Sequence, residues 1–268
     1  MPARPRLSQA AVEQRRQDVL RYVAGHEETR IADLADRFDV SLMTMHRDLD
    51  DLAARRLLRK VRGRAVAFPA LTMETATRFR EGSNLAAKAA LCAAVAGRIT
   101  PGSTVLVDDS TTLFPLAESL AGLDQLTVVT NSVGFAQRAG SAAGTDVTLL
   151  GGHYHSEFHS CTGPDVTRAL SRIRADIALM SAAAVLEGRL FHPLREYAEV
   201  KEAMLASAST ALLLVDHSKF GKTATYAYGT ADAYQAVITD TSTPGAETAA
   251  IADMGVAVES VDPGEPAS

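Results

Sequence analysis

The chain has 268 residues, of which 47% are hydrophobic, with a formal net charge of −5 and two cysteines. This length exceeds the usual size of one domain, so we expect two domains. No apolar run approaches the roughly 18 residues of a membrane span, the N-terminus lacks the apolar stretch of a secretion signal, and two cysteines do not make a disulfide framework. A soluble protein of the reducing cytoplasm, with no membrane partner, is therefore expected.

The charge is divided unevenly along the chain. Residues 1–70 hold 14 Lys and Arg against 10 Asp and Glu, a net +4. The remainder holds 13 basic and 22 acidic residues, a net −9. A basic segment joined to an acidic one predicts that the first meets a polyanion while the second has another task.

Two short amphipathic helices are predicted first, over about residues 12–23 and 31–38. In the second, Ile31, Leu34 and Phe38 follow the spacing of a core-facing helix. A tight turn at 39–41 comes next, and Ser41 is suited to cap the helix after it.

The third helix is expected over LMTMHRDLDDLAARRLL, and its spacing predicts that four residues face the core: Leu42, Met45, Leu49 and Leu52. Its opposite face carries Met43, Thr44, His46, Arg47 and Asp50. Two helices joined by a short turn, the second with polar groups near its amino end, form the helix-turn-helix layout. In that layout the second helix reads base edges in the major groove.

The next segment, LLRKVRGRAVAFP, predicts a basic hairpin that lies along the DNA backbone as a wing. Thr44 suits a phosphate or a thymine methyl, and Arg47 suits a guanine edge or a phosphate. The residues expected to contact double-stranded DNA are Ser41, Met43, Thr44, His46, Arg47, Lys60, Arg62 and Arg64. Two other interpretations stay open: the charges merely solvate a small helical domain, or the winged helix contacts only proteins.

The segment from RRQDVL to RGRA resembles the N-terminal winged helix of the DeoR family of bacterial transcription regulators. That family's signature, VS-x-x-T-[IM]-x-R-D-L, is matched by Val40, Ser41, Thr44, Met45, Arg47, Asp48 and Leu49. Two positions differ: His46 stands where Arg is usual, and the usual His-Gly-Gly-Ala of the wing reads Arg62–Gly63–Arg64–Ala65. We therefore expect an operator unlike that of typical members, with tighter non-specific contact to the backbone.

After a polar connector, a helix is expected from Leu85 to Ile99, and then apolar runs alternate with helical segments. The runs are 104–107, 126–130, 147–150, 176–180, 211–215, 236–239 and 256–258. This alternation predicts an α/β fold with a doubly wound, mostly parallel sheet covered on both faces. The expected organisation is a winged helix-turn-helix at 1–68, a linker at 69–84, an α/β effector-binding and oligomerisation domain at 85–262 and a disordered tail at 263–268.

Polar residues follow the ends of these strands, where parallel sheets bind ligands. The residues expected to bind a small-molecule effector are Asp108, Asp109, Ser110, Thr111, Thr112, Thr130, Asn131, Ser132, Gly151, Gly152, Glu196 and Lys219. Lys219 is the best single candidate for neutralising an anionic group. A helix beginning near Arg195 is expected to bring Glu196, Glu199 and Lys201 toward one edge of the pocket.

These stretches continue the resemblance, which spans roughly residues 8–240. The motifs DDSTT, TVVTN, GG, GP, DHSKFG and VITD are similar to landmarks of the DeoR effector domain. The resemblance implies a fold related to ribose-5-phosphate isomerase and glucosamine-6-phosphate deaminase. It also implies a repressor of catabolic genes for sugars or related metabolites, controlled by a metabolite that is often phosphorylated. Because one recognition helix covers few base pairs, a homodimer or homotetramer is expected.

Asp109 and Ser110 depart from the family pattern, which has Ser and Gly at these positions. A carboxylate at 109 repels phosphate unless Lys219 or a metal compensates. The effector is therefore expected either not to be a simple sugar phosphate or to present a hydroxyl or amine to Asp109. The alternative is that Asp109 points away from the pocket.

Other chemistry is weakly indicated. The stretch HYHSEFHSC could supply zinc ligands from His153, His155, His159 and Cys161, but its spacing is not a common one and surface histidines are the simpler interpretation. An isomerase or deaminase-like enzyme with an accessory winged helix is the alternative function, with acid/base groups from Asp108, Glu196 and Lys219. No Gly-x-Ser-x-Gly, Walker or Gly-x-Gly-x-x-Gly motif occurs. We expect no catalytic residue, metal or cofactor.

Overall fold

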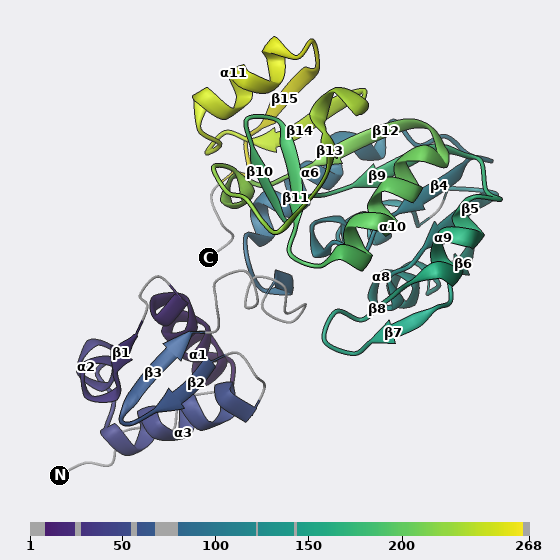
Figure 1. Cartoon of the computed structure of the whole chain (residues 1–268). Helices are drawn as coiled ribbons and strands as arrows, with labels where there is room; N and C mark the ends of the chain where they lie inside the picture. Colours follow the sequence, from purple (N-terminus) through teal and green to yellow (C-terminus); the bar gives the residue numbers. More distant parts are fainter. Residues whose placement is uncertain are drawn as a thin grey trace. The chain divides into compact units, whose positions relative to one another are not determined.

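The computed structural model describes residues 9–24, 28–54, 58–67, 80–121, 123–141 and 144–264 (Figure 1). The chain divides into two units, residues 1–79 and 80–268. Of the expected linker, residues 69–79 lie outside the described residues, and 80–84 belong to the second unit. Residues 265–268 of the expected tail also lie outside them. No helix in the described part of the chain is long and apolar enough to cross a membrane.

The first unit, here called the head, combines three helices with a small antiparallel sheet. Its elements are α1 (Gln9–Ala24), β1 (Thr29–Arg30), α2 (Ile31–Arg37), α3 (Leu42–Ala54), β2 (Leu58–Val61) and β3 (Arg64–Ala67). The strands pair in the order β1-β3-β2. The helices bury one apolar cluster, to which α1 contributes Val19, α2 Leu34, and α3 Met45 and Leu49. This is the predicted winged helix-turn-helix.

The prediction that Leu42 faces the core is wrong. Met45, Leu49 and Leu52 are buried, but half of Leu42 is exposed. Leu42 is the first residue of α3, and Val40, in the turn just before it, packs against the core cluster at this end of the helix. Periodicity places a side chain on a face, but it does not show where the neighbouring helix stops covering that face.

The wing turns tightly between β2 and β3. Arg62 and Gly63 both have positive φ, 46° and 77°, the condition for a two-residue turn whose twist matches its strands. The carbonyl oxygen of Gly63 accepts a hydrogen bond from the amide of Ile31 at 3.1 Å. The tip of the wing is therefore tied to the first residue of α2.

The second unit, here called the sensor body, is built on a seven-stranded parallel sheet (Figure 1). Its strands are β4 (Thr104–Val107), β5 (Leu126–Thr130), β6 (Thr145–Leu149), β9 (Ala175–Met180), β12 (Ala208–Leu214), β14 (Ala236–Asp240) and β15 (Ala257–Val261). The predicted strands are all present, with ends shifted by up to three residues. Every neighbouring pair is parallel, which confirms the predicted α/β fold.

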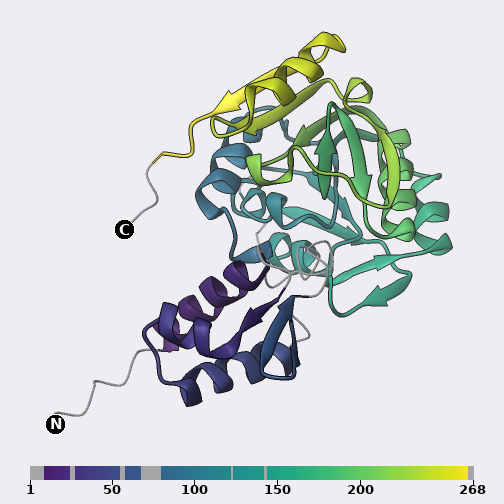
Figure 2. The ribbon, with the colours of Figure 1, turned by 60° about the vertical axis from the view of Figure 1, so that its left-hand side comes forward.

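Helices cover both faces of this sheet. One face carries α6 (Leu85–Ala96), α7 (Leu116–Ser119) and α8 (Val133–Ala139), and the other carries α9 (Pro164–Leu170), α10 (Arg195–Ala206) and α11 (Gly245–Asp253). Successive residues of a strand point to opposite faces. Val105 and Val107 accordingly pack with Leu91 of α6, whereas Leu106 belongs to the cluster that contains Val200 of α10. In Figures 1 and 2, α11 and β15 form one end of the sensor body.

The strand order β15-β14-β12-β9-β4-β5-β6 reverses direction at its middle. From β4 the chain first builds outward through β5 and β6, then returns to place β9 on the other side of β4 and continues to β15. The connections after β4 and β9 therefore diverge, and a crevice at their carboxyl ends is where such sheets bind ligands.

Smaller elements lie around the strand ends. They are the hairpin of β7 (His153–His155) and β8 (Ser160–Thr162), the antiparallel sheet of β10 (Ala184–Leu186), β11 (Arg189–His192) and β13 (Tyr226–Thr230), and the short helices η1 (Thr111–Leu113), η2 (His217–Lys219) and η3 (Ala231–Ala233).

Candidate functional site

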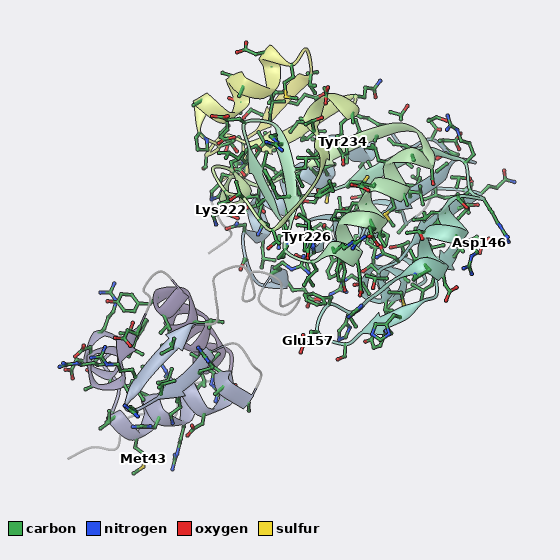
Figure 3. All side chains as sticks on the ribbon, in the orientation of Figure 1. Met43, Asp146, Glu157, Lys222, Tyr226 and Tyr234 are labelled. Carbon is green, nitrogen blue, oxygen red and sulfur yellow. The ribbon has the colours of Figure 1, made fainter. Side chains whose placement is uncertain are left out.

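The recognition helix α3 begins with a capped first turn. The amide of Thr44 donates to Ser41 Oγ at 3.1 Å, and the two hydroxyl oxygens lie 2.8 Å apart. This confirms Ser41 as the N-cap. The side chain of Met43 projects from the outer face of this turn (Figure 3), with 67% of the residue exposed. The helix therefore presents an open tip, including the exposed Leu42.

Lys60 of the wing connects β2 to α3. Its Nζ lies 2.6 Å from Asp50 Oδ1 and 3.1 Å from His46 Nδ1. Arg47 and Arg62 are exposed, while Arg64 forms an ion pair with Glu28. The structure thus brings His46 and Lys60, predicted from separate elements, into direct contact.

Asp48 is a buried anchor that the pattern of the recognition helix did not assign. It accepts from Arg15 Nε at 2.8 Å and from Arg16 Nε at 3.0 Å. Arg16 also lies 3.1 Å from Asp51. These ion pairs fasten α1 to α3. The sequence does contain a signal for this role of Asp48. It is a carboxylate next to Leu49, on the inward side of an amphipathic helix.

In the sensor body, a buried ion pair between Asp108, which follows β4, and Lys201 of α10 lies at the carboxyl ends of the central strands. Both residues are at most 2% exposed. Asp108 also accepts from the amides of Ser110 and Ser181, each at 2.9 Å. Lys201 Nζ donates to the carbonyl oxygen of Ser181 at 3.0 Å and reaches Ser110 Oγ at 3.4 Å. The three N–H groups of this ammonium are therefore all engaged.

Asp109 is buried and turned toward the hairpin, not toward solvent. Ser160 Oγ donates to Asp109 Oδ2 at 3.3 Å and lies 3.0 Å from the hydroxyl of Tyr197. Burial, and next the charge of Asp109, raise the pKa of Tyr197 above its ordinary value. His192 stacks on Tyr197, and burial with the nearby Lys201 lowers the pKa of His192 to about 3. Among Asp109, Ser160, His192 and Tyr197, only the Asp109 carboxylate carries a charge.

A second lysine borders the same loop from α6. Lys88 Nζ donates to Thr111 Oγ1 at 3.1 Å and to the carbonyl oxygen of Arg80. Burial lowers the pKa of Lys88 to about 8. Lys88 and Thr111 line a pocket of about 540 Å³ that also includes Phe114 and Arg138. The guanidinium of Arg138 stacks 4.1 Å from the centre of the Phe114 ring. This pocket is an opening next to the otherwise buried crevice.

At the end of β5, one acceptor is left without a partner. Asn131 donates from Nδ2 to the carbonyl oxygen of Cys161 at 2.9 Å. Its Oδ1 has no hydrogen-bond partner in the described part of the chain, although the residue is fully buried. Thr130 and Ser132 have local partners: Ser132 Oγ caps α8 by accepting from Phe135, and Thr130 Oγ1 accepts from the amide of Ser132.

The other residues that were predicted to bind the effector lie around the ends of the strands. Glu196 accepts from Thr162 at 2.9 Å and lies 3.3 Å from His155. A Cβ at Gly152 would meet the carbonyl oxygen of Thr162 at 2.5 Å, so this glycine permits close backbone packing, whereas Gly151 has open space. Thr112 Oγ1 accepts from Ser181 Oγ at 3.4 Å.

Lys219 lies on η2 beside Asp216, and the charges of both residues act on Lys88 of α6. Burial alone would raise the pKa of Asp216, but Lys219 and hydrogen bonds from Ser218 outweigh it and hold that pKa below its usual range. Lys201, which sequence analysis placed at the edge of the pocket, is buried in the ion pair with Asp108.

The histidine-rich hairpin does not form a metal cluster among the described residues, since no three His, Cys, Asp or Glu side chains there are placed to hold an ion. Burial raises the pKa of Cys161, and it raises the pKa of Cys92 to about 12. Both thiols are therefore poor nucleophiles at neutral pH.

A basic winged helix joined to a polar crevice at the switch point of an α/β sheet defines a class of protein: a ligand-responsive transcription regulator. Residues 15–69 match the DeoR-like helix-turn-helix domain, and residues 83–241 match the DeoR C-terminal sensor domain. The chain therefore belongs to the DeoR family, as its motifs indicated. It is a DNA-binding repressor with a C-terminal sensor domain.

Individual relatives agree with this assignment. The chain is 30% identical to the transcriptional repressor AccR of Agrobacterium fabrum over 80% of this chain and 83% of that protein. It is 28% identical to the glycerol-3-phosphate regulon repressor of Escherichia coli over 92% and 98%. These relatives are regulators, so they do not support the alternative of an isomerase-like enzyme. Ribose 5-phosphate isomerase from Plasmodium falciparum is similar with a TM-score of 0.36 and 16% identity, over 51% of this chain and 52% of that chain.

Proposed function

We propose that this chain represses genes of sugar-related metabolism and releases its operator when a polyhydroxylated metabolite binds in the crevice after β4 and β9. Relatives include the glycerol-3-phosphate regulon repressor and the transcriptional regulator IolR of Bacillus subtilis. The name of the first links a relative to the genes of a small phosphorylated polyol, and this supports sugar-related genes as the target.

DNA contact is assigned to the open tip of α3 and to the wing. Residues 41, 43, 44, 46 and 47 provide the base-reading tip, and Lys60, Arg62 and Arg64 provide backbone contact. Binding of the chain's own promoter duplex should weaken steeply between low and moderate salt, because Lys and Arg displace counterions from phosphates. A flat response would favour a winged helix that contacts only proteins.

A homodimer or homotetramer is the proposed binding form, because two recognition helices are needed to span paired half-sites. Light scattering after size exclusion tests this form. A monomer at the concentration that saturates DNA would contradict it.

The unpartnered Asn131 Oδ1 carries the proposal on effector chemistry. A buried acceptor without a donor costs about 1–3 kcal/mol, which a ligand hydroxyl or amine would recover. The carboxylate of Asp109, linked through Ser160 to the same hairpin, is also an acceptor. Lys201 has no N–H group left for a phosphate. The crevice therefore favours a ligand that donates hydrogen bonds, which agrees with the expectation for Asp109.

An anionic group on the ligand would bind at the other end of the loop. Lys88 uses two of its three N–H groups on Thr111 and Arg80, and it borders the open pocket. An anion held by the third N–H group would compete with the carbonyl of Arg80 for the position of Lys88. Because Arg80 is the first residue of the second unit, this competition offers a route to the head. Only a ligand that distinguishes two conformations alters DNA affinity in this way.

Isothermal titration with free polyols, amino sugars and their phosphorylated counterparts tests the proposal. We expect the tightest ligand to lose about tenfold or more in affinity to the variant Asp109→Ser, which removes the acceptor charge. Lys88→Met should weaken only the phosphorylated members, and Lys222→Met, at an exposed lysine outside the pocket lining, serves as the matched control. Equal binding of every ligand by wild type and Asp109→Ser would contradict the assignment.

A further inference from the structure

The recognition helix and the wing touch through His46 of α3 and Lys60 of β2. This contact determines the tautomer of His46 as well as the position of the wing. His46 lies in the second turn of α3, between Met43 and Asp50 on the outward face. Lys60, from β2, reaches both His46 Nδ1 and Asp50 Oδ1. We propose that His46 reads one base edge as a hydrogen-bond donor, in a tautomer fixed by Lys60, and thereby excludes cytosine at one position of each half-site. This inference rests on the proposed DNA-reading role of α3.

The tautomer follows from the chemistry of the two groups. An ammonium has three N–H donors and no acceptor, so at 3.1 Å from Lys60 the Nδ1 atom of His46 must accept. A neutral imidazole with an accepting Nδ1 carries its proton on Nε2. Asp50 Oδ1 accepts from the same Lys60 ammonium at 2.6 Å, which keeps the ammonium in place. Within the described residues, no group accepts from Nε2.

A single N–H donor recognises a definite set of bases in the major groove. Guanine offers N7 and O6, adenine offers N7 and thymine offers O4, whereas cytosine presents only its N4 amino donor. Nε2–H therefore accepts three bases and rejects cytosine. An arginine at this position, which the family pattern favours, has a fork of donors suited to guanine. Lys60 thus acts as a positioning residue for base recognition, in addition to any contact it makes with phosphate.

In vitro selection from a random duplex library tests the inference without knowledge of the operator. The full-length wild type should select sites that disfavour cytosine about fivefold or more at one position per half-site. His46→Arg should shift that same position toward guanine. Lys60→Met frees the ring to place its proton on Nδ1, so cytosine should become tolerated there. Lys60→Arg keeps a donor-only partner and should retain the exclusion.

Arg62→Met provides the matched control for lost charge. Arg62 is exposed on the same wing, so its removal should weaken all sequences about equally and leave the base preference unchanged. Retention of the cytosine exclusion in Lys60→Met, or a selected site that does not change with His46→Arg, would overturn the inference while leaving DNA binding intact. If no sequence is enriched by the wild type, the DNA-reading role of α3 fails, and the inference fails with it.

Discussion

The head and the sensor body place their functional side chains in opposite surroundings. In the head, Met43, Arg47 and Arg62 are exposed, whereas Asp48 is buried in its ion pairs with α1. In the sensor body, Asp108, Asn131 and Lys201 are almost completely buried. The head is therefore a preformed surface whose partner needs only to dock. The sensor groups mostly satisfy one another, so the ligand that we propose for this site must replace internal hydrogen bonds when it binds.

The largest expected effect comes from the Asp108–Lys201 pair. Lys201→Met leaves the Asp108 carboxylate buried without its cation, and the free energy of unfolding of the sensor body should fall by about 3–5 kcal/mol. Urea denaturation of the full chain measures it. The double variant Asp108→Asn with Lys201→Met should recover part of the loss. A fall below about 1 kcal/mol would mean that the pair is already solvated.

The corresponding change in the head is Asp48→Asn. Two arginines then lose their shared carboxylate, but each is partly exposed, so the expected loss is smaller, about 2–3 kcal/mol. DNA affinity should fall with it, because α1 no longer holds α3. The exposed Asp50→Asn is the control for stability, with an expected change within about 0.5 kcal/mol. Equal losses in the two variants would contradict the anchoring role of Asp48.

The next effect is a pH dependence of the sensor body. Burial lowers the pKa of Lys88 from 10.5 to about 8, so between these values the unfolded chain binds more protons than the folded one. The free energy of unfolding should therefore rise with pH, by about 2 kcal/mol between pH 7 and 9.5. Above pH of about 10 the buried Tyr228, whose pKa is raised, acts in the opposite direction.

Lys88→Met isolates this contribution. The variant should lack the rise, so the difference between its denaturation profile and that of the wild type should follow the titration of one lysine. Parallel profiles for the two proteins between pH 7 and 9.5 would show that Lys88 is hydrated in the folded state.

The smallest effect is expected at Leu42. Leu42→Ala removes an exposed side chain and should change stability by no more than about 0.5 kcal/mol, whereas Leu49→Ala, on the same helix but fully buried, should cost about 2–5 kcal/mol. A marked loss of DNA affinity in Leu42→Ala, without a loss of stability, would place the exposed tip of α3 at the interface with DNA.

Local pattern was enough to predict the helices of the head and the seven strands of the parallel sheet, with strand ends shifted by up to three residues, but not the antiparallel sheet of β10, β11 and β13. Helical spacing identified α2 and α3, and apolar runs identified the seven strands. Because residues that follow parallel strands share one edge, the loop from Asp108 to Thr112 could be assigned to a site. The prediction for Leu42 was wrong because the spacing of apolar residues in α3 does not show where a neighbouring helix ends.

The contacts that sequence analysis did not predict are those whose partners lie far apart along the chain. Lys201 is 93 residues from Asp108, and Asp48 is 33 from Arg15. The sequence pattern around a lysine in an amphipathic helix is the same whether its side chain is solvated or buried. The contact between His46 and Lys60 likewise depends on how the wing folds back on α3.

The reversal of strand order at β4 has a consequence for synthesis of the chain. Asp108 is made early, but Ser181 and Lys201 follow only with the second half of the sheet. The head, with its own core within residues 19–65, is complete long before. A growing chain therefore completes the DNA-binding head first and the sensor body last. A chain that stops prematurely within the sheet would leave a fragment that is unable to respond to the metabolite.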